Sequence, residues 1–283
     1  MVRKQITGQW LSGERAAFEL AEADLAESIF AEGESPLKHS LDIDARQTVF
    51  EWKYPFWYAK DVSLTDSAFL DTARSGPWYV DGLTWRRVLV AAPKTLRHSQ
   101  RIVLDNVQFT KADETLWWCQ DVQLDHVTAN GDYFGMNSTK IKASDLSLFG
   151  NYAFDGCQDI EISGSKLLSK DAFWNCQNVV VRDSIIVGEY LGWNSKNLTF
   201  INCLIESLQG LCYIDNLTIK DCRLLNTTLA FEYSTVDVEV KGSIDSIINP
   251  TSGIIKADQI GQIVLDPERV DPQATTIITK ETQ

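Results

Sequence analysis

Apolar residues recur along this chain with a period of nineteen residues. Three consecutive blocks, beginning at Asn178, Asn197 and Asn216, each start with Asn, followed by an apolar, a variable and a second apolar residue. Within a block, segments such as NVVVRDSIIV alternate at period two and are rich in Val and Ile, which is typical of β-strands. The pattern predicts strands rather than helices, because two helices in nineteen residues would each be about two turns long.

The period continues through nearly the whole chain when the first apolar residue of each block is taken as a marker. Apolar residues also recur two and seven residues after most markers. The markers are Ala23, Ile43, Val62, Leu83, Ile102, Val122, Ile141, Ile160, Val179, Leu198, Leu217 and Val236. We therefore predict an all-β fold, a single solenoid domain over residues 1–283 with about twelve stacked coils and a cap at each end.

Asp or Asn precedes the marker in seven of the twelve blocks. These residues tolerate left-handed backbone and form turns, so we expect each coil to turn there. Stacked in register, Asn178, Asn197 and Asn216 would form a ladder of amides. The alternative, a cation site, is disfavoured because Arg101 and Lys140 occupy the same position in other blocks.

The net charge limits the classes of partner that the protein could bind, and the cysteine spacing indicates how its cysteines are used. Lys and Arg number 26 against 39 Asp and Glu, a net charge of −13, which disfavours nucleic acid and anionic membranes as partners. The first residues lack the apolar run of a signal peptide, and no segment approaches the ~20 residues of a membrane span, so we expect a cytoplasmic protein. Cys157 and Cys176, like Cys203 and Cys222, are nineteen residues apart, and we predict reduced, buried packing residues.

Several distinctive segments are spread along the chain: GERAAFEL, GESPLKHS, YPFWYAKDVSL, ARSGPWYV, DAFWNCQNV, GEYLGWNSKNLTFINC, QGLCYIDNLTI and LAFEYS. Together they resemble a bacterial family catalogued as domain of unknown function 3737. The resemblance covers essentially the whole chain and is looser over residues 83–97 and the last forty residues. It implies a single-stranded right-handed parallel β-helix of the pectin-lyase-like architecture, and it implies no known activity.

The third side of each coil is the expected binding face. Positions eleven, thirteen and fifteen after the marker carry many aromatic, amide and acidic residues, whereas positions twelve, fourteen and sixteen are mostly small or apolar. Alternation predicts that the first set faces water, although Asp155 falls in the second set and a slip of one residue would exchange the faces. The predicted substrate-binding residues are Tyr152, Phe173, Asn175, Tyr190, Asn194, Tyr213 and Glu232.

Aromatic rings beside amides and carboxylates suit sugars, which have an apolar face and a rim of hydroxyls. The predicted partner is therefore a glycan or a sugar-containing small molecule, with Asp171 and Glu232 orienting hydroxyls. Asp171 and Glu189 fall on adjacent coils and are the candidate catalytic pair, because glycoside hydrolases use two carboxylates ~5.5 to ~9.5 Å apart. A polysaccharide lyase would use cations, but Lys38 and Arg74 do not share a coil with these acids.

Other readings of the same residues stay open. The aromatic residues of the third side could simply stabilise a solvated sheet by cross-coil packing. A non-catalytic protein-interaction scaffold would show a contiguous apolar patch or paired ends. No motif in the sequence supports the third class, an enzyme that acts on nucleotides or small metabolites. We predict no cofactor and no metal, because His39, His98 and His126 lie at unrelated positions of the repeat.

Overall fold

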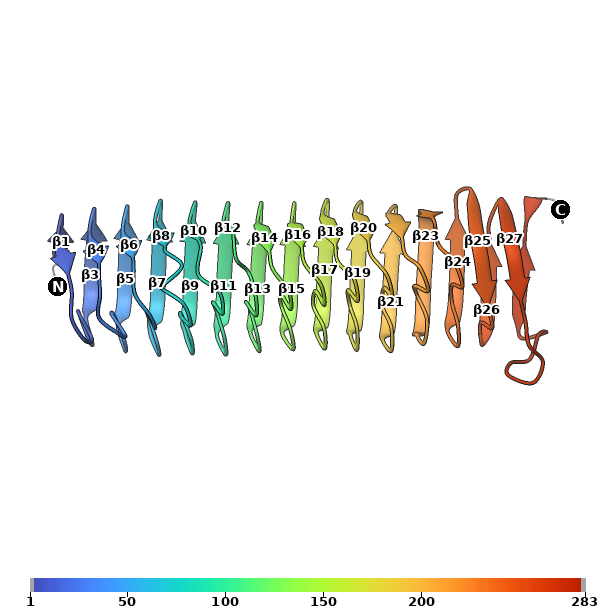
Figure 1. Ribbon diagram of the computed structural model, residues 1–283, viewed down its shortest axis with the longest axis horizontal. Helices are drawn as coiled ribbons and strands as arrows, with labels where there is room; N and C mark the ends of the chain where they lie inside the picture. Colours follow the sequence, from blue (N-terminus) through green and yellow to red (C-terminus); the bar gives the residue numbers. More distant parts are fainter. Residues whose placement is uncertain (1–2, 281–283) are drawn as a thin grey trace. The chain divides into compact units, whose positions relative to one another are not determined.

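The structure is a computed structural model that describes residues 3–280 in two compact units, Met1–Ser147 (unit 1) and Leu148–Gln283 (unit 2). Each unit is a parallel β-solenoid (Figure 1). The two units together contain about 14 turns of ~19 residues. Residues 3–280 contain no α-helix, and none of them forms a helix that spans a membrane. The all-β parallel solenoid is confirmed, and the single domain stays a prediction.

Coils of unit 1 contribute a longer and a shorter strand to two parallel sheets. The longer strands are β1 (Lys4–Thr7), β3 (Ala21–Ala26), β5 (Leu41–Arg46), β7 (Lys60–Thr65), β9 (Asp81–Arg86), β11 (Gln100–Asp105), β13 (Gln120–Asp125) and β15 (Thr139–Ser144). The shorter strands are β2 (Trp10–Leu11), β4 (Ile29–Phe30), β6 (Val49–Phe50), β8 (Ala68–Phe69), β10 (Leu89–Val90), β12 (Gln108–Phe109) and β14 (Thr128–Asn130). Strand β16 (Ser147–Phe149) crosses the boundary between the units.

Unit 2 repeats this arrangement and adds a two-stranded sheet. The longer strands are β17 (Gln158–Ser163), β19 (Gln177–Arg182), β21 (Lys196–Ile201), β23 (Asp215–Leu225), β24 (Thr235–Val240), β26 (Ser252–Lys256) and β28 (Thr275–Ile278). The shorter strands are β18 (Lys166–Leu168), β20 (Ile185–Val187) and β22 (Leu204–Glu206), which pairs with the second half of β23. Strands β25 (Ser243–Ile248) and β27 (Gln259–Val264) form the separate sheet.

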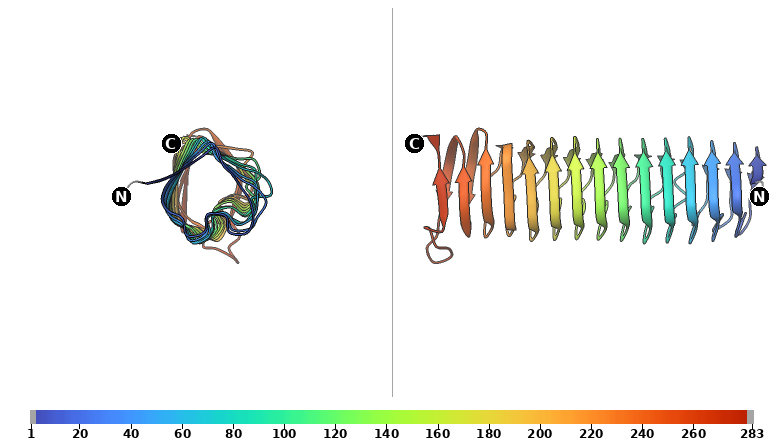
Figure 2. Two further views of the ribbon diagram at one scale, coloured as in Figure 1. Left: turned by 90° about the vertical axis from the view of Figure 1, so that its left-hand side faces the viewer. Right: turned by 180° about the vertical axis from the view of Figure 1, so that it is seen from behind.

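The predicted marker residues lie on the longer strands and pair with one another in the register of the sheet. Ile43 pairs with Val62 in unit 1 and Val179 with Leu198 in unit 2, and every marker is buried. The residues seven positions later form the second apolar column, in which the Phe50 ring stacks on its neighbours with centroids 5.2 and 4.7 Å away. Seen end-on in Figure 2, the coils of unit 1 trace superimposed loops. Their inward side chains therefore build one continuous core per unit.

The structure has slightly more coils than the predicted number of about twelve, because the repeat is hidden at both ends. In the first coil the marker position is held by Lys4, which pairs with Ala23, so the apolar signal is missing. Near the other end Val236 pairs with Gly253 and Gly253 with Thr275. These steps of seventeen and twenty-two residues depart from nineteen, so the segment predicted as a cap holds further parallel strands.

The polar and cysteine columns confirm the predicted stacking. Asn197 Nδ2 donates to Asn178 Oδ1 at 2.8 Å, and Asn216 Nδ2 donates to Asn197 Oδ1 at 2.9 Å. All three residues have φ between 56° and 69°, the left-handed conformation expected at this turn. The six cysteines all lie in the described part of the chain, are buried and form no disulfide bond there. The Cys222 Sγ accepts the N–H of Cys203 at 3.3 Å, so these thiols are packing residues that also satisfy backbone donors.

Candidate ligand-binding face

The third side of the coils is a hydrogen-bonded series of turns rather than a strand. Asp171, Phe173 and Asn175 have φ of 58°, 57° and 54°, a conformation that costs a non-glycine residue about 1–2 kcal/mol. Backbone hydrogen bonds between coils hold it in place. Asp171 N–H donates to the Glu189 carbonyl of the next coil, and Phe173 N–H donates to the Ala153 carbonyl of the preceding coil, both at 2.9 Å. Side chains on this backbone do not alternate between core and solvent.

The predicted orientation of this side is therefore wrong at two positions of the repeat. Phe173, predicted to bind substrate, is fully buried and stacks on Phe154 with ring centroids 5.6 Å apart. Trp174 and Trp193, predicted to face the core, are partly exposed. Asp155, the residue that misfitted the alternation, occupies the same position as these tryptophans and is also partly exposed. That misfit was the signal in the sequence that the phase changes here.

Five residues of unit 2 line an open pocket of about 330 Å³: Trp174, Asn175, Trp193, Asn194 and Tyr213. Asn175, Asn194 and Tyr213 belong to the predicted face, and Tyr213 is 40% exposed. The two tryptophans are the residues that the sequence reasoning missed. A volume of this order is typical of small-molecule sites, which combine apolar walls with a few polar groups.

The aromatic rings of the pocket are tilted against one another. Trp193 lies 6.4 Å from Trp174 and 5.0 Å from Tyr213, with interplanar angles of 58° in both pairs. The indole N–H of Trp193 donates to the Gln209 carbonyl at 2.6 Å, which fixes the ring. Tilted rings do not cover each other's faces, so part of each aromatic face stays open to a ligand.

Amides beside these rings form a short ladder. Asn194 Nδ2 donates to Asn175 Oδ1 at 2.7 Å, and Asn175 Nδ2 donates to Asp155 Oδ1 at 3.0 Å. An amide nitrogen carries two N–H groups, and each of these bonds uses only one. The ladder therefore fixes the amides in place while leaving hydrogen-bonding capacity for a ligand.

Three other predicted residues flank the pocket. The Tyr152 ring lies 6.1 Å from Trp174, and the Tyr190 ring packs edge-on against Trp193 at 5.1 Å. Glu232 Oε2 accepts the Tyr213 hydroxyl at 3.2 Å. Tyr152 and Glu232 contact lining side chains from neighbouring coils, whereas Tyr190 contacts Trp193 within one coil, and none of the three lines the pocket itself.

The predicted catalytic pair does not lie in the pocket. Asp171 is 3% exposed, and its Oδ2 has no hydrogen-bond partner among the described residues. Glu189 is partly exposed and pairs with Lys170 at 3.3 Å. A carboxylate as buried as that of Asp171 is not placed to orient the hydroxyls of a ligand on the surface, which corrects that part of the prediction.

The buried Asp171 makes stability depend on pH. Burial raises the pKa of its carboxyl above the ordinary 3.8, and the charge of Lys170 and a hydrogen bond with Tyr152 offset part of that rise. The folded state therefore holds the proton more tightly, so the stability from this group is greatest below pH 3.8 and falls as pH rises through the raised pKa.

We expect Asp171→Asn to melt at a higher temperature than the parent protein at neutral pH, because the variant has no carboxylate to desolvate. The two proteins should converge at about pH 3, where Asp171 is protonated. Thermal unfolding followed by circular dichroism across this pH range measures the difference. A variant that melts below the parent by the same margin at every pH contradicts this account.

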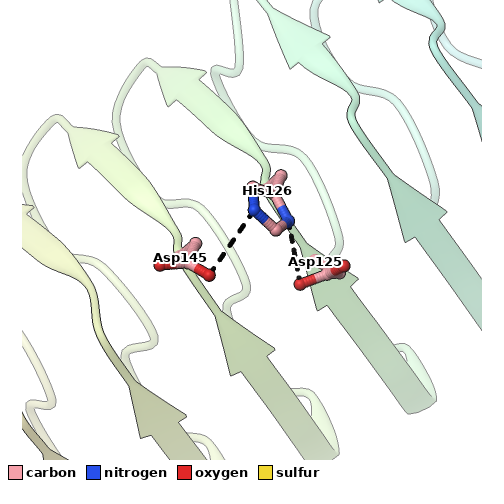
Figure 3. Close-up of side chains that lie close together, drawn as sticks. All are labelled: Asp125, His126 and Asp145. Carbon is pink, nitrogen blue, oxygen red and sulfur yellow. Dashed lines mark ion pairs between the residues drawn. The ribbon is translucent and has the colours of Figure 1, made fainter.

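Unit 1 contains an exposed cluster of Asp125, His126 and Asp145 (Figure 3). His126 Nδ1 lies 3.1 Å from Asp125 Oδ1, and its Nε2 lies 3.6 Å from Asp145 Oδ2. The hydrogen bond with Asp125 raises the pKa of His126. Because the two ring nitrogens face different carboxylates, the geometry suits a protonated imidazole between two acids better than a single metal ion, and we assign no metal site.

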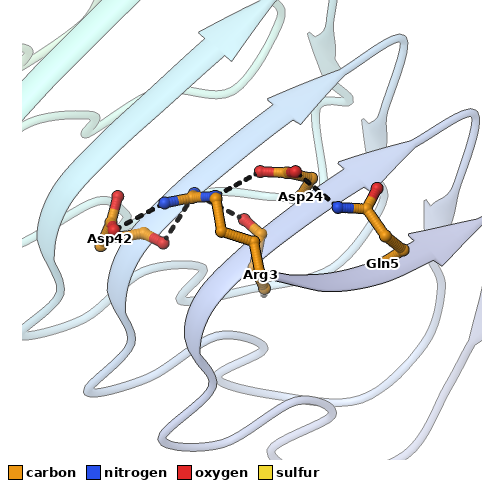
Figure 4. A network of polar contacts seen from close by, with 5 residues as sticks. Arg3, Gln5, Asp24 and Asp42 are labelled. Atoms are coloured by element: carbon orange, nitrogen blue, oxygen red, sulfur yellow. Dashed lines mark hydrogen bonds and ion pairs between the residues drawn. The ribbon is translucent and has the colours of Figure 1, made fainter. Parts of the chain in front are cut away.

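An open groove of about 600 Å³ follows the longer strands of unit 1. At one end Arg3 donates to Asp24 at 2.5 Å and to Asp42 at 2.6 Å, and Gln5 also donates to Asp24 (Figure 4). Arg101 pairs with two further aspartates at the other end. These side chains are 32–57% exposed, where ion pairs contribute little to stability. The network ties neighbouring coils together, and its charges are already paired.

Unit 1 also carries an exposed aromatic ladder of His39, Tyr58, Tyr79, His98 and Trp118. Its rings stack with centroids 4.8–5.1 Å apart and interplanar angles of 5–12°. The prediction that His39 and His98 lie at unrelated positions is wrong, because coils of twenty and twenty-one residues shift the numbering but not the column. Parallel rings at this distance cover each other's faces, so this ladder presents mainly ring edges.

Comparison with curated proteins gave no match to this chain. The model of a family described as "Protein of unknown function (DUF3737)" matches residues 4–278. Among solved structures, the chain is similar to a variant catalytic domain of a GH87 alpha-1,3-glucanase in complex with nigerose, at 9% identity and a TM-score of 0.34. That match covers 99% of this chain, which spans 64% of the length of the glucanase domain.

Two further solved structures are similar at the same level. The A-module of the mannuronan C-5 epimerase AlgE4 of Azotobacter vinelandii is 10% identical with a TM-score of 0.28, over 98% of this chain and 89% of that one. The plasmid-mediated fluoroquinolone resistance protein QnrB1 is 11% identical with a TM-score of 0.26, over 79% of this chain and 91% of that one. Likenesses this distant carry no argument about a ligand.

Proposed function

This chain belongs to the DUF3737 family, which is described only as of unknown function. We propose that it is a carbohydrate-binding protein. Its ligand is a glycan or another sugar-containing molecule, held at the pocket of Trp174, Asn175, Trp193, Asn194 and Tyr213. The observation that carries the proposal is the pair of 58° tilts between the aromatic rings, which leave ring faces open beside fixed amides.

Sugars match both halves of this surface. The C–H face of a pyranose packs on an aromatic ring, and its hydroxyls reach donors and acceptors at the rim. Trp174, Trp193 and Tyr213 lie on successive coils spaced ~4.8 Å apart, which approximates the length of one sugar unit. An oligosaccharide lying along the coils would contact one ring per unit, with Asn175 and Asn194 bonding its hydroxyls.

The proposal is limited to binding. A glycoside hydrolase or polysaccharide lyase activity through Asp171 and Glu189 stays a prediction. It is left out of the proposal because Asp171 is buried and Glu189 forms an ion pair with Lys170. An enzyme at this site would need both carboxyl groups beside the bound sugar.

A glycan array probed with the full chain tests the proposal, followed by titration of each bound glycan. We expect Trp193→Ala to weaken binding by about 10-fold or more, because loss of an aromatic contact in a binding site commonly costs 1–2 kcal/mol or more. Asn194→Ala should weaken it less, by about 3- to 10-fold, since one hydrogen bond is lost.

The control is Trp118→Ala, which removes a tryptophan that is 44% exposed from the aromatic ladder of unit 1. This variant should bind the glycan like the parent protein. Absence of any glycan signal above background, or equal losses in Trp118→Ala and Trp193→Ala, would falsify the proposal.

A second candidate function, a non-catalytic protein-interaction scaffold, is favoured by the aromatic ladder of unit 1. Tyr58, Tyr79 and Trp118 are 41–44% exposed in one contiguous column, and contiguous apolar patches on a soluble protein often mark interfaces. A scaffold would give no signal on the glycan array. Its protein partner would be lost on Trp118→Ala and retained on Trp193→Ala, the reverse of the carbohydrate result.

A further inference from the structure

A second pocket of unit 1 shares no lining residue with the groove or the aromatic ladder and is rich in positive charge. It measures about 340 Å³ and is lined by Trp52, Lys53, Asp71, Thr72, Arg74, Pro93 and Lys111. Three of its four charged side chains are cations. In the chain as a whole, acidic residues outnumber basic ones by 39 to 26, so this pocket reverses the charge balance of the protein.

Two of the three cations are not neutralised by acids of the chain. Lys53 pairs with Glu34 at 2.6 Å, but Arg74 and Lys111 take part in no ion pair among the described residues. The hydrogen bond with Glu34 raises the pKa of Lys53, and the nearby positive charge of Arg74 offsets a small part of that rise. Like charges gathered in one concave site repel each other, and a bound anion relieves that repulsion.

The backbone builds this pocket by departing from the repeat. Six residues separate β6 from Trp57, whereas eight separate β8 from Trp78 in the next coil. The two additional residues fall in the segment that carries Asp71, Thr72 and Arg74, and Thr72 Oγ1 donates to the Glu51 carbonyl of the preceding coil. The longer corner is therefore tied back onto its neighbour while Arg74 stays exposed beside the pocket.

One wall of the pocket is apolar. Trp52 and Pro93 line it together with the cations, and Lys53 Nζ lies 5.6 Å from the centre of the Trp52 ring. Arginine forms paired hydrogen bonds with planar or tetrahedral oxyanions, whereas an indole ring packs on a flat organic body. The pocket thus offers an anion site and an adjoining apolar surface.

We infer that this pocket binds a small organic anion, with Arg74, Lys53 and Lys111 around its phosphate or carboxylate group and Trp52 against its body. The site is independent of the pocket in unit 2 and of the carbohydrate proposal. Because its cations are exposed, binding weakens as ionic strength rises.

Isothermal titration of the full chain at low salt tests the inference, with glucose 6-phosphate and glucuronate as anionic probes and glucose as the neutral control. The two anions distinguish a phosphate from a carboxylate preference, and binding of either supports the site. We expect Arg74→Ala to weaken binding by about 10-fold, because a charge-assisted hydrogen-bonding partner is lost. Asp71→Asn should strengthen it by removing the carboxylate of the pocket.

Lys220→Ala is the matched control, since it removes one exposed cation from β23 in unit 2. This variant should bind the anionic probe as the parent does, and addition of salt should weaken the parent. Equal heats for glucose and for both anions would overturn the inference. So would the absence of anion binding, or a loss on Lys220→Ala as large as that on Arg74→Ala.

Discussion

Replacing Val181 with Asp is expected to prevent unit 2 from folding. Val181 lies on β19, is fully buried, and has Ile162 and Phe200 as its register partners on the two adjacent strands. A carboxylate at this position would be surrounded by apolar side chains above and below. Burial of an unpaired charge costs several kcal/mol or forces the group to stay protonated, which is a large share of the stability of a typical domain.

The control for this substitution is its neighbour. Arg182 is exposed at the next position of β19, so Arg182→Asp should change the free energy of unfolding by only about 0.5 kcal/mol. Thermal unfolding followed by circular dichroism compares the two variants with the parent. If Val181→Asp melted at the same temperature as Arg182→Asp, the inward and outward assignment of the longer strands would be wrong.

The core of both units was predictable because equivalent residues of successive coils lie directly above one another in a solenoid. Apolar residues spaced by nineteen must lie above one another if each block is one coil, so the series from Ala23 to Val236 gives the register directly. The amide ladder of Asn178, Asn197 and Asn216 followed from the same argument. Such columns need no long-range information, because each coil contacts only its neighbours.

The candidate site was only partly predictable, because its backbone is unusual for its residues. Alternation of side chains holds for strands, but Asp171, Phe173 and Asn175 adopt left-handed φ values that non-glycine residues seldom take. The residue types at these positions do not predict this conformation. The error moved Phe173 to the surface and Trp174 into the core, while Asn175 kept its correct outward position.

Variation in coil length explains the remaining errors. His39 and His98 stack in one column although their distances from the preceding markers differ, because the additional residues fall before them at the corner of the coil. Arg74 also lies in a longer coil. Its segment has no counterpart in the nineteen-residue coils, so the repeat did not predict where its side chain lies. Departures from a repeat are where a solenoid builds individual features, and the pocket of Arg74 is one of them.

Replacing Gly253 with Ala is expected to be strongly destabilising, because a Cβ there would lie 1.9 Å from the Val236 carbonyl oxygen of the adjacent strand β24. Backbone cannot move aside as a flexible side chain can, so β24 and β26 must separate locally. Gly242 is the matched control: its φ of +95° strains an alanine much as the +119° of Gly253 does, but nothing lies within 4 Å of its Cβ position.

We expect Gly242→Ala to cost about 1–2 kcal/mol, the usual penalty for a left-handed alanine, and Gly253→Ala to cost about 2 kcal/mol more from the clash. At about 2–4 °C per kcal/mol, the second variant should melt roughly 4–8 °C below the first. Differential scanning calorimetry of both variants measures the gap, and the shared backbone strain cancels in the comparison. Equal melting temperatures would mean that close approach of β24 and β26 is not what requires glycine at position 253, and that the conformation alone accounts for it.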